Sequence, residues 1–584
     1  SMFNMQIKNN LNLTENALIV LDKRYLKKDR DGNVIETPEE MFHRVAKNIA
    51  SAEFIYNPKA VVSAVEKEFY EIMTNLEFLP NSPTLMNAGR ELQQLAACFV
   101  LPVDDSLDSI FEAVKDTAII HQSGGGTGFS FSRLRPKNDR VSTTSGVASG
   151  PVSFMKVFNT ATEVIKQGGA RRGANMGILR VDHPDIIEFI RAKENPAEFT
   201  NFNLSVGIDD NFMKAFEDDS TFDLINPRNN KAAKKLKAKD VFNNIVDAAW
   251  KNGEPGIVFL DTINRFNPTP HLGRIEATNP CGEQPLLPYE ACNLGSVNLT
   301  RMLKKKDNRY EIDYNKLERI INIAVRFLDN VIDVNKYPLP QIDRMCKGNR
   351  KIGLGIMGFA DMLILLNIPY SSQAALDTAE RLMKFIDEKA KEISMELAKE
   401  RGVFPNYKGS IYEKSGVIMR NATTTTIAPT GTLSIIANCS SGIEPLYGIT
   451  YTRKILDDLE LKVINPNFEE IAKRKGFYSE RLMDTIIAFG SIQERTDVPD
   501  DVKMLFTTAH DITPEDHVRI QAAFQKYTDN AVSKTVNFHE DADKSDVEKT
   551  FLLAYKLGCK GVTIYRSGSR ERQVLSCRNN IQYC

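Results

Sequence analysis

Hydrophobic positions recur with helical spacing in several long stretches of the chain. Residues 36–75 combine this spacing with many charges, and Thr37 and Glu40 in TPEEMFHRVAKNIA predict a capping box at a helix start. Glycine and proline predict where other helices begin and end. Such helices are expected at 107–122, from Pro151 through Phe154, Val157 and Phe158 to Gly168–Gly169, at 315–334, and from about 372 to Gly402.

Short stretches rich in β-branched and aromatic residues lie between these helices. FNLSVGI at 202–208, GIVFL at 256–260 and GSVNL at 295–299 are predicted strands. PNSPTLMNAG at 80–89 is predicted to be a loop from its proline, asparagine and glycine content. Alternation of strand and helix along most of the chain indicates one large α/β architecture and not a string of small modules.

Composition and charge indicate which kinds of partner the protein is not expected to bind. The chain has 584 residues, of which 42% are hydrophobic, and a net charge of −1. This balance predicts no binding to nucleic acid or to an anionic membrane surface. No apolar run approaches the ~18 residues of a membrane span, and SMFNMQIKNN at the amino end has no signal-peptide hydrophobic region. A cytoplasmic location is expected.

The cysteines are too few for a disulfide scaffold in a chain of this length. No C-x-x-C pair occurs, and the seven histidines do not cluster with the cysteines, so no protein metal site is expected. A reducing compartment is predicted, where thiols serve as reagents or as buried apolar side chains. The cysteines are Cys98, Cys281, Cys292, Cys346, Cys439, Cys559, Cys577 and Cys584.

The segment NPCGEQPLLPYEACNLGS at 279–296 carries the most chemical information. Asn279, Cys281 and Glu283 occupy alternate positions, so an extended segment would place amide, thiol and carboxylate on one side. Pro280 cannot donate to a sheet ladder, and Gly282 permits close approach of another group. We expect an extended loop inserted into a cavity. A buried cysteine beside a polar turn is the alternative that this spacing leaves open.

This segment resembles the finger-loop signature of the class II ribonucleotide reductases, and the similarity runs along nearly the whole chain. Further motifs in the family's order are LTENALIVLDKRYL, PNSPTLMNAG, HQSGGGTGFSFSRLRPKNDRVSTTSGVASGPVSFM, QGGARRGANMGIL, TIAPTGTLSIIA and GCKGVTIYRSGSR. The resemblance implies a ten-stranded α/β barrel of two five-stranded halves with a central finger loop. It implies a helical region at 1–78, the barrel at 79–570 and a redox tail at 571–584.

The resemblance also implies catalytic roles. Cys281 would become the thiyl radical that removes hydrogen from the ribose 3′ carbon, Glu283 would take the 3′ hydroxyl proton, and Asn279 would hold the ribose hydroxyls. Loss of the 2′ hydroxyl needs two electrons, which a thiol pair supplies by closing a disulfide. Cys98 and Cys292 match the family's reducing pair, and their pairing rests on the resemblance alone.

Cys577 and Cys584 would form the carboxy-terminal shuttle that re-reduces this pair and passes oxidation to a thioredoxin-like protein. Their spacing differs from a C-x-x-C motif, and many relatives continue into a longer cysteine-rich tail. The chain therefore either is truncated or uses a shorter shuttle. Cys346, Cys439 and Cys559 are expected to be structural.

Two kinds of loop are predicted to bind phosphates or effectors. ATTTTIAPTGTLSII at 422–436 combines hydroxyls, glycine and a predicted helix start, which suits a phosphate, although an ordinary threonine-rich strand and turn has the same pattern. The family resemblance favours the phosphate site. It assigns the substrate diphosphate to Ser82, Pro429, Thr430, Gly431, Thr432 and Leu433.

The loops RLRPKNDRVSTTSGVASG and QGGARRGANMG flank the helix that begins at Pro151. Charged glycine loops are usually solvated connections, but in the family these two form a specificity site for deoxynucleoside triphosphates or ATP at a homodimer interface. By position, Asp105 would contact the effector ribose and Arg135 its phosphates, and Arg171 and Arg172 would transmit its identity. Only about 80 residues precede PNSPT, fewer than an additional ATP-cone needs, so no inhibition by dATP is expected.

The radical source is inferred from what replaces the motifs of other classes. Oxygen-dependent reductases use two adjacent tyrosines near the carboxy terminus, whereas here Tyr565 is followed by Arg566. No glycyl-radical motif is visible. Adenosylcobalamin remains as the cofactor, and the lack of a D-x-H-x-x-G signature predicts no histidine ligand to its cobalt.

Two rival functions are open. A class I-type catalytic subunit would need a separate radical-generating metalloprotein, and activity with adenosylcobalamin alone would separate the two. A non-catalytic nucleotide-binding regulator would not need Asn279, Cys281, Glu283, Cys98 and Cys292 together. Similarity to the dimeric class II enzymes favours ribonucleoside diphosphates as substrates.

Overall fold

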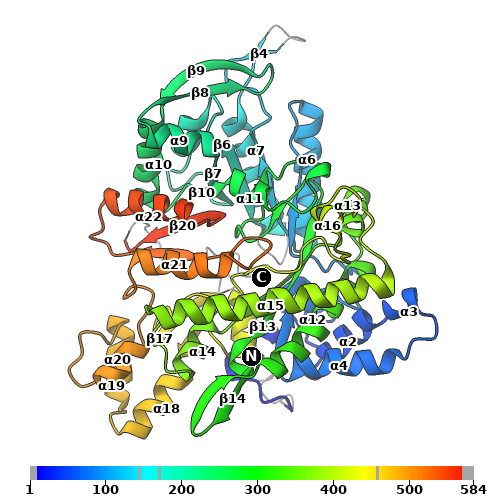
Figure 1. Cartoon of the computed structure of the whole chain (residues 1–584), viewed down its shortest axis with the longest axis vertical. Helices are drawn as coiled ribbons and strands as arrows, with labels where there is room; N and C mark the ends of the chain where they lie inside the picture. Colours follow the sequence, from blue (N-terminus) through cyan, green and yellow to red (C-terminus); the bar gives the residue numbers. More distant parts are fainter. Residues whose placement is uncertain (1–9, 142–145, 169–172, 456–458, 569–584) are drawn as a thin grey trace.

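The structure is a computed structural model that describes residues 10–141, 146–168, 173–455 and 459–568. Helices at the amino end pack beside a large mixed sheet that is closed into a barrel and surrounded by further helices (Figure 1). The amino-terminal helices are α1 (Glu15–Arg24), α2 (Pro38–Ala50), α3 (Glu53–Tyr56) and α4 (Val62–Thr74). The predicted capping box is confirmed, since Thr37 and Glu40 cap each other's backbone at the start of α2.

Five strands form the first half of the barrel. They pair in the order β2-β3-β6-β7-β10, and every neighbouring pair is parallel. Almost every residue of these strands is buried, as expected for parallel strands covered on both faces. Their bounds are β2 (Cys98–Val100), β3 (Gly126–Ser130), β6 (Asn175–Arg180), β7 (Phe202–Ile208) and β10 (Gly256–Phe259).

The second half also runs parallel throughout. β13 (Ala291–Asn298) pairs with β16 (Ile352–Met357), and β19 (Thr535–Phe538) pairs with β20 (Gly561–Arg566). The segment 425–427 lies between these pairs, because Leu354 bridges to Thr425 and Ile427 bridges to Val532, both in parallel.

The two halves join antiparallel at both seams. β13 pairs with β2 at one seam, and β10 pairs with β20 at the other. Among the described residues, ten strand segments therefore form a closed ring of two parallel five-stranded halves, which confirms the predicted barrel. A further short strand, β1 (Phe78–Pro80), pairs antiparallel with β13 and is not one of these ten segments.

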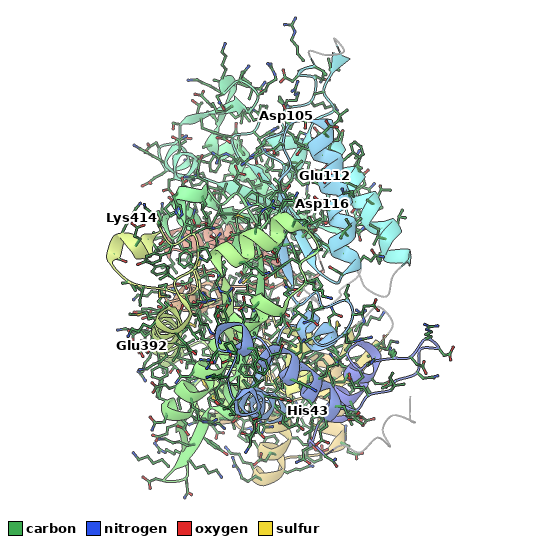
Figure 2. All side chains as sticks on the ribbon, turned by 90° about the vertical axis from the view of Figure 1, so that its right-hand side faces the viewer. His43, Asp105, Glu112, Asp116, Glu392 and Lys414 are labelled. Carbon is green, nitrogen blue, oxygen red and sulfur yellow. The ribbon has the colours of Figure 1, made fainter. Side chains whose placement is uncertain are left out.

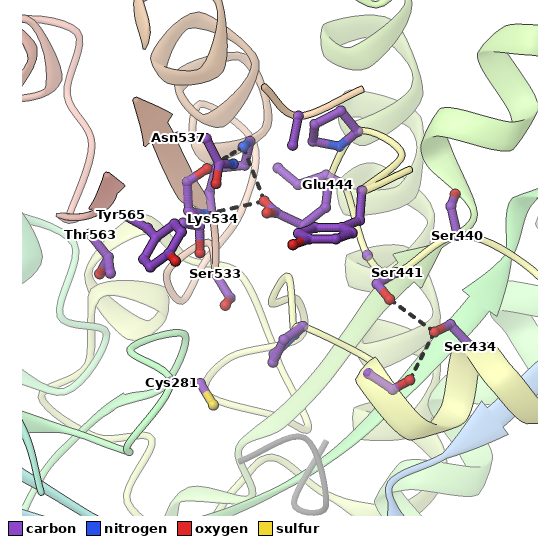
Figure 3. Close-up of a pocket in the computed structure, with 18 of the residues that line it drawn as sticks. Cys281, Ser434, Ser440, Ser441, Glu444, Ser533, Lys534, Asn537, Thr563 and Tyr565 are labelled. Carbon is purple, nitrogen blue, oxygen red and sulfur yellow. Dashed lines mark hydrogen bonds and ion pairs between the residues drawn. The ribbon is translucent and has the colours of Figure 1, made fainter. Parts of the chain in front are cut away.

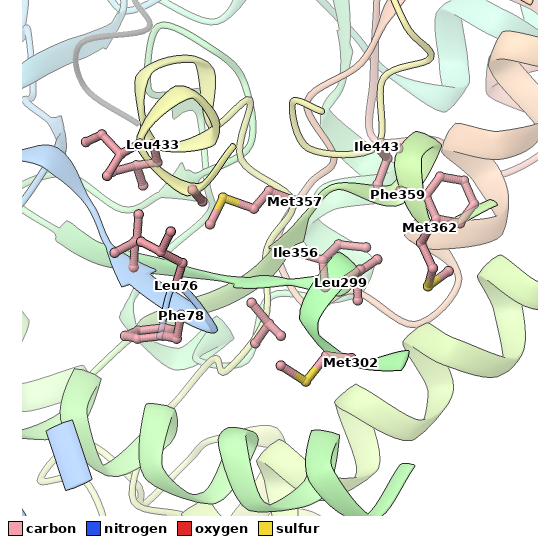
Figure 4. Packing of buried hydrophobic residues seen from close by; sticks show 14 of the residues in the cluster. Leu76, Phe78, Leu299, Met302, Ile356, Met357, Phe359, Met362, Leu433 and Ile443 are labelled. Carbon is pink, nitrogen blue, oxygen red and sulfur yellow. The ribbon is translucent and has the colours of Figure 1, made fainter. Parts of the chain in front are cut away.

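The three largest buried clusters among the described residues pack on the two faces of the sheet. One packs the second half against the amino-terminal helices and includes Phe78, Leu299 and Met357 (Figure 4). Another packs the first half against its helices. The third joins side chains from both halves, including Val100, Ile178 and Leu294, and so fills part of the barrel interior.

Helices cover the outside of the barrel. In Figure 1 those of the first half lie in the upper part, and α12 and α15 lie with the amino-terminal helices in the lower part. The predicted helix at 315–334 is α12, and the one that stops at Gly402 is α15. The helices are α6 (Leu107–Gln122), α7 (Pro151–Gly168), α8 (Ile186–Ile190), α9 (Asp210–Glu217), α10 (Ala238–Asn252), α11 (Leu260–Arg265), α12 (Tyr314–Val334), α13 (Pro340–Asn349), α14 (Phe359–Leu365), α15 (Gln373–Arg401), α16 (Ile411–Ser415), α17 (Gly431–Ala437), α18 (Pro466–Lys475), α19 (Glu480–Phe489), α20 (Asp500–Leu505), α21 (Pro514–Gln525) and α22 (Lys544–Lys556).

The loop predicted at 80–89 is wrong in its centre, where residues Ser82–Asn87 form the helix α5. Asn81 caps it by accepting the backbone N–H of Thr84, and Pro83 lies in its first turn. Asparagine and proline favour loops, but they equally favour the first turn of a helix. Burial of all six residues decided between the two.

Several two-stranded hairpins project from the barrel. β8 and β9 lie at the upper end of the molecule and β14 lies at the lower end (Figure 1). The hairpin β11–β12 differs from these because all four of its strand residues are buried. The hairpins pair β4 (Arg140–Val141) with β5 (Gly146–Val147), β8 (Thr221–Asn226) with β9 (Lys231–Lys237), β11 (Ala277–Thr278) with β12 (Pro285–Leu286), β14 (Leu303–Lys306) with β15 (Arg309–Ile312), and β17 (Thr450–Ile455) with β18 (Leu459–Ile464).

Candidate active site

The segment predicted to carry the chemistry forms a hairpin, residues 277–286, which we call the finger hairpin. Its strands are β11 and β12, and its tip contains Asn279, Cys281 and Glu283. The tip is a tight turn and not the expected extended segment. Asn279 closes the turn, because its backbone N–H donates to the Gln284 carbonyl at 3.2 Å and its Oδ1 accepts the Gln284 N–H at 2.9 Å.

The structural role of Gly282 differs from the one expected. Gly282 has φ +84, and a Cβ added to it would meet nothing within 4 Å. It is needed for a left-handed turn conformation and not for close approach of another group. The close approach occurs at Gly128 in β3, where an added Cβ would lie 1.7 Å from the Thr278 carbonyl oxygen.

The finger hairpin is anchored to both halves of the barrel. On the first half, Asn203 in β7 donates its side-chain N–H to the Pro280 carbonyl at 2.8 Å. On the second half, the Glu283 carbonyl accepts the Ala531 N–H and the Thr426 hydroxyl, each at 2.9 Å. The tip therefore lies between the two halves, inside the barrel.

Asn279 and Glu283 converge on the thiol of Cys98. The Asn279 Nδ2 donates to the Cys98 Sγ at 3.2 Å, and the Cys98 thiol donates to Glu283 Oε1 at 3.9 Å. Burial raises the pKa of the Cys98 thiol well above its ordinary value, and the charge of Glu283 raises it further. The thiol is therefore held protonated beside the carboxylate. Cys281 is half-buried and lines a cavity.

Cys98 and Cys292 are direct cross-strand neighbours on β2 and β13. Facing residues of an antiparallel pair have Cα atoms about 4.5–5.5 Å apart, which lies within the range of about 4.4–6.8 Å that a disulfide spans. Both thiols are free and buried. Residues 194 positions apart are thus placed where they can close a disulfide, a pairing that their spacing did not predict.

The cavity beside Cys281 has a volume of about 630 Å³. Its walls come from the first half, from the finger hairpin, from the segment that follows Thr426 and from the second half. The buried Lys534 forms an ion pair with the half-buried Glu444 on its far wall. Lys534 Nζ lies 3.1 Å from Glu444 Oε1 and 2.7 Å from His517 Nδ1. Figure 3 shows this pair with Tyr565 and Asn537 across the cavity from Cys281.

Some of the residues predicted to bind the substrate phosphates line this cavity, and others do not. Pro429 and Gly431 line it at the start of α17. The Thr430 hydroxyl accepts the Gly442 N–H at 2.7 Å, which holds that turn. Thr432 is buried, and Leu433 packs in the core. Ser82 is buried and hydrogen-bonded to the Tyr25 hydroxyl at 2.7 Å, and it does not line the cavity as the structure describes it.

The predicted effector residues Asp105 and Arg135 form an ion pair at 2.9 Å. Asp105 lies just before α6, whose Glu112 and Asp116 follow toward the centre of the molecule (Figure 2). Arg171 and Arg172 lie outside the described residues, as do Cys577 and Cys584.

Tyr565 and Arg566 point to opposite sides of β20. Tyr565 lines the cavity, whereas Arg566 donates to the Trp250 and Glu540 carbonyls and stacks on the Trp250 ring at 3.9 Å. The position after Tyr565 therefore faces away from the cavity.

Sequence reasoning missed two ion pairs near the predicted site, each with a buried lysine. One is Lys534 with Glu444 in the cavity wall, and the other is Lys351 with Glu290 near Cys292. Their partners are 90 and 61 positions apart, so no local pattern could have revealed them. Within the described ranges, no three His, Cys, Asp or Glu side chains cluster so that they could hold a metal ion, and no helix is long and apolar enough to span a membrane.

Comparison with known proteins agrees with this architecture. Residues 11–93 match the family model of the ribonucleotide reductase all-alpha domain, and residues 96–418 and 413–565 match that of its barrel domain. A vitamin B12-dependent ribonucleoside-diphosphate reductase of Thermoplasma acidophilum is 49% identical, covering 98% of this chain and 81% of the relative. One of Mycobacterium tuberculosis (strain CDC 1551 / Oshkosh) is 48% identical, covering 98% and 82%.

A solved structure is similar in fold. The Actinobacillus ureae class Id ribonucleotide reductase alpha subunit superposes with a TM-score of 0.78, covering 99% of each chain at 22% identity.

Proposed function

The chain belongs to the ribonucleotide reductase family, whose all-alpha and barrel domains it matches, and we propose that it is an adenosylcobalamin-dependent ribonucleoside-diphosphate reductase. The observation that carries the proposal is the grouping inside the barrel. Asn279 and Glu283 both contact Cys98, Cys98 faces Cys292 across two strands, and Cys281 of the same hairpin lines a cavity.

The roles of these residues follow from their places. Cys281 faces the cavity, so its thiyl radical would remove the hydrogen from the ribose 3′ carbon of a bound substrate. Glu283 would accept the 3′ hydroxyl proton, since a buried carboxylate is a suitable base, and Asn279 would hold the ribose hydroxyls. Cys98 and Cys292 would supply two electrons by closing their disulfide as the 2′ hydroxyl leaves as water.

The cavity has the size of a small-molecule site, which suits the nucleotide beside Cys281. Its volume lies in the range of about 300–1,000 Å³ that small-molecule sites have. Polar side chains of its far wall, among them Lys534, Asn537 and Tyr565, would hold the cofactor's amide groups. When bound, adenosylcobalamin supplies the radical by homolysis of its cobalt–carbon bond. The chain contributes the thiol that receives the radical and the walls that exclude water.

Substrate phosphates are proposed to bind at Pro429, Thr430, Gly431, Thr432 and Leu433, with Ser82 as a further contact. Pro429 and Gly431 line the cavity, and backbone N–H groups at the start of α17 are suitable donors. Direct binding of the diphosphate to Ser82 requires its hydroxyl to exchange the Tyr25 contact for the ligand.

We propose a homodimer with deoxynucleoside triphosphates or ATP bound at the interface as specificity effectors. Leu107 and Phe111 on α6 are exposed apolar side chains close to the Asp105–Arg135 pair, which supports an interface there. Arg135 would exchange part of its contact with Asp105 for the effector phosphates. Arg171 and Arg172 are proposed for the loop that reports the effector's identity.

The proposed domain division is 1–78, 79–570 and 571–584, with Cys577 and Cys584 of the last segment as the shuttle to a thioredoxin-like reductant. A cycle that depends on free thiols suits a reducing cytoplasm. The identity of residue 566 supports adenosylcobalamin over a radical imported through paired tyrosines, because Arg566 stands where the second tyrosine of such a pair would be.

The decisive experiment is a turnover assay of the purified chain with adenosylcobalamin, dithiothreitol, one ribonucleoside diphosphate and a matched effector. Deoxynucleotide formation without a second protein is the expected result. Activity that appears only when a metal-loaded partner is added would replace this proposal with the class I alternative.

A further inference from the structure

Lys351 and Glu290 form an ion pair that is removed from solvent. Lys351 Nζ lies 2.7 Å from Glu290 Oε1, and each side chain is only 2% exposed. The Glu290 carboxylate also accepts the Leu287 N–H at 2.6 Å and the Asn349 Nδ2–H at 2.7 Å. A buried ion pair is often no more stabilising than apolar side chains of the same size. Stability is therefore a weak explanation for this pair.

The pair lies directly beside Cys292. The register of β13 and β16 places Asn293 opposite Ile352, so the preceding residues Cys292 and Lys351 are neighbours. The Cys292 thiol donates to the Lys351 carbonyl at 3.7 Å. Glu290 precedes Cys292 by two positions, and alternation along an extended chain places both on one side.

The two thiols of the Cys98–Cys292 pair differ in the charged group that influences each of them most. Burial is the largest influence on both and raises the pKa of each. After burial, the largest influence on Cys98 is the negative charge of Glu283, which raises the pKa of Cys98 further. The largest influence on Cys292 after burial is the positive charge of Lys351, which lowers the pKa of Cys292. The titratable groups that face Cys292 are Lys351, Cys346, Glu290, Glu283 and Cys98.

We propose that Lys351 polarises the Cys98–Cys292 disulfide, so that a dithiol reductant attacks Cys98 and Cys292 leaves as the thiolate. Glu290 positions the ammonium group of Lys351 and moderates its charge. Lys351 is thus a positioning residue of the re-reduction half of the cycle. This inference rests on the proposed function, because it requires that Cys98 and Cys292 form a disulfide.

The step balances without a further reactant. One thiolate of the dithiol bonds to the Cys98 sulfur and breaks the Cys98–Cys292 bond, which leaves the electron pair on Cys292. The second thiolate of the reductant then attacks its own mixed disulfide and releases Cys98. The reductant is oxidised to a disulfide, and its two protons end on the two cysteines.

The test follows reduction of the disulfide in the full chain without cofactor. Wild type, Lys351→Met, Glu290→Gln and Lys351→Arg are oxidised with diamide, the Cys98–Cys292 bond is confirmed by peptide mass, and reduction by dithiothreitol is timed at several pH values. We expect Lys351→Met to be about tenfold slower, because the leaving thiol loses the cation that lowers its pKa, and a thiol of higher pKa leaves more slowly. Glu290→Gln should be several-fold faster, and Lys351→Arg should stay within about twofold of wild type.

If Lys351→Met slows reduction of the disulfide and Glu290→Gln accelerates it, the role is electrostatic. Loss of packing would instead change both rates in the same direction. The inference would be overturned if both substitutions changed the reduction rate in the same direction, or if the Lys351→Met rate stayed within about twofold of wild type. Should Lys351→Met fail to fold, the predicted acceleration in Glu290→Gln decides, and an unchanged or slower rate contradicts the inference.

A separate arm tests the proposed function. Wild type is given adenosylcobalamin and a ribonucleoside diphosphate without reductant, and its cysteines are mapped after one turnover. A disulfide neither at Cys98–Cys292 nor at Cys577–Cys584 would overturn both the function and the inference. A disulfide whose reduction is indifferent to residue 351 would overturn the inference alone.

Discussion

Asn279 holds two parts of the active site through one side chain. Its Oδ1 accepts the Gln284 N–H and closes the tip of the finger hairpin, while its Nδ2 donates to the Cys98 Sγ. Glu283 is placed by its backbone carbonyl, which accepts two hydrogen bonds from the second half. Its carboxylate therefore reaches Cys98 from a fixed backbone.

Glu283→Gln keeps the size of this side chain and removes its capacity as a base. We expect turnover to fall by about 10²–10⁴-fold, the usual contribution of a general base, with little change in stability. Steady-state deoxynucleotide formation measures the first and thermal unfolding the second. Glu276→Gln is the control, since Glu276 pairs with Arg133 outside the cavity. Near-normal turnover by Glu283→Gln would remove Glu283 from the mechanism.

At the scale of elements, the finger hairpin depends on a strand position without a side chain in the first half of the barrel. Gly128 in β3 leaves room for the Thr278 carbonyl, and Asn203 in β7 holds the next turn. The hairpin can enter the barrel only where a strand has no side chain in its path.

Gly128→Ala should displace the finger hairpin, because the added Cβ would lie 1.7 Å from the backbone oxygen of Thr278. Turnover is expected to fall by at least about 10²-fold, since misplacing reacting groups by about 1 Å has that effect. Gly177→Ala in β6 is the matched control, because its Cβ would meet only side-chain atoms, the nearest at 3.1 Å. Equal activity of the two variants would contradict this account of how the hairpin is placed.

The hairpin β8–β9 holds the proposed effector loop from outside. Arg228, in the turn between its strands, donates to both carboxylate oxygens of Asp139 at 2.8 and 3.0 Å. Asp139 follows Arg135 in the same loop. A bidentate pair fixes the orientation of the groups that it joins, so the hairpin restricts the loop that carries Arg135.

Arg228→Gln is therefore expected to weaken binding of a deoxynucleoside triphosphate effector by about two- to fivefold, the range for an exposed ion pair. Turnover without effector should not change. Equilibrium binding of the nucleotide to the chain measures the effect. Lys235→Gln provides the comparison, because Lys235 lies on the same hairpin and pairs with Asp223 of that hairpin at 4.0 Å. An identical affinity in both variants would show that the hairpin does not act on the effector loop.

At the scale of the whole molecule, a buried charged cluster joins the amino-terminal helices to the barrel. Asp329 in α12 contacts Arg350, Arg401 and Arg420, which come from three different segments. Arg401 also pairs with Glu53 of α3 at 2.6 Å. Burial opposes ionisation of Asp329, but the three guanidinium groups lower its pKa to about 2.

Asp329→Asn should destabilise the chain by about 3–5 kcal/mol, because it leaves buried arginines without their counter-charge. Urea unfolding of the variant measures this change. Asp333→Asn is the milder comparison, since Asp333 pairs with Arg350 at the edge of the cluster and is more exposed. A loss of less than about 1 kcal/mol in Asp329→Asn would mean that the cluster is not a major link between these parts.

The sequence by itself determined the local elements and the chemical types of the site. The capping pair Thr37 and Glu40, the strand at 202–208 and the helix that stops at Gly402 were predicted because short-range periodicity and caps specify them. Its long motifs were specific enough to predict the barrel from family resemblance. The loop at 80–89 failed because Asn81 and Pro83 suit a helix start as well as a loop, and only burial distinguishes the two.

Tertiary structure alone decided which distant residues meet. The register of β2 and β13 places Cys98 beside Cys292, and that of β13 and β16 places Lys351 beside Cys292. The turn at Asn279–Gln284 replaced the expected extended segment, because the tip is held by contacts to both halves of the barrel. The physical reason is the same in each case. Pairing across a sheet depends on the order in which strands close the barrel, and that order is not encoded in the spacing of residues along the chain.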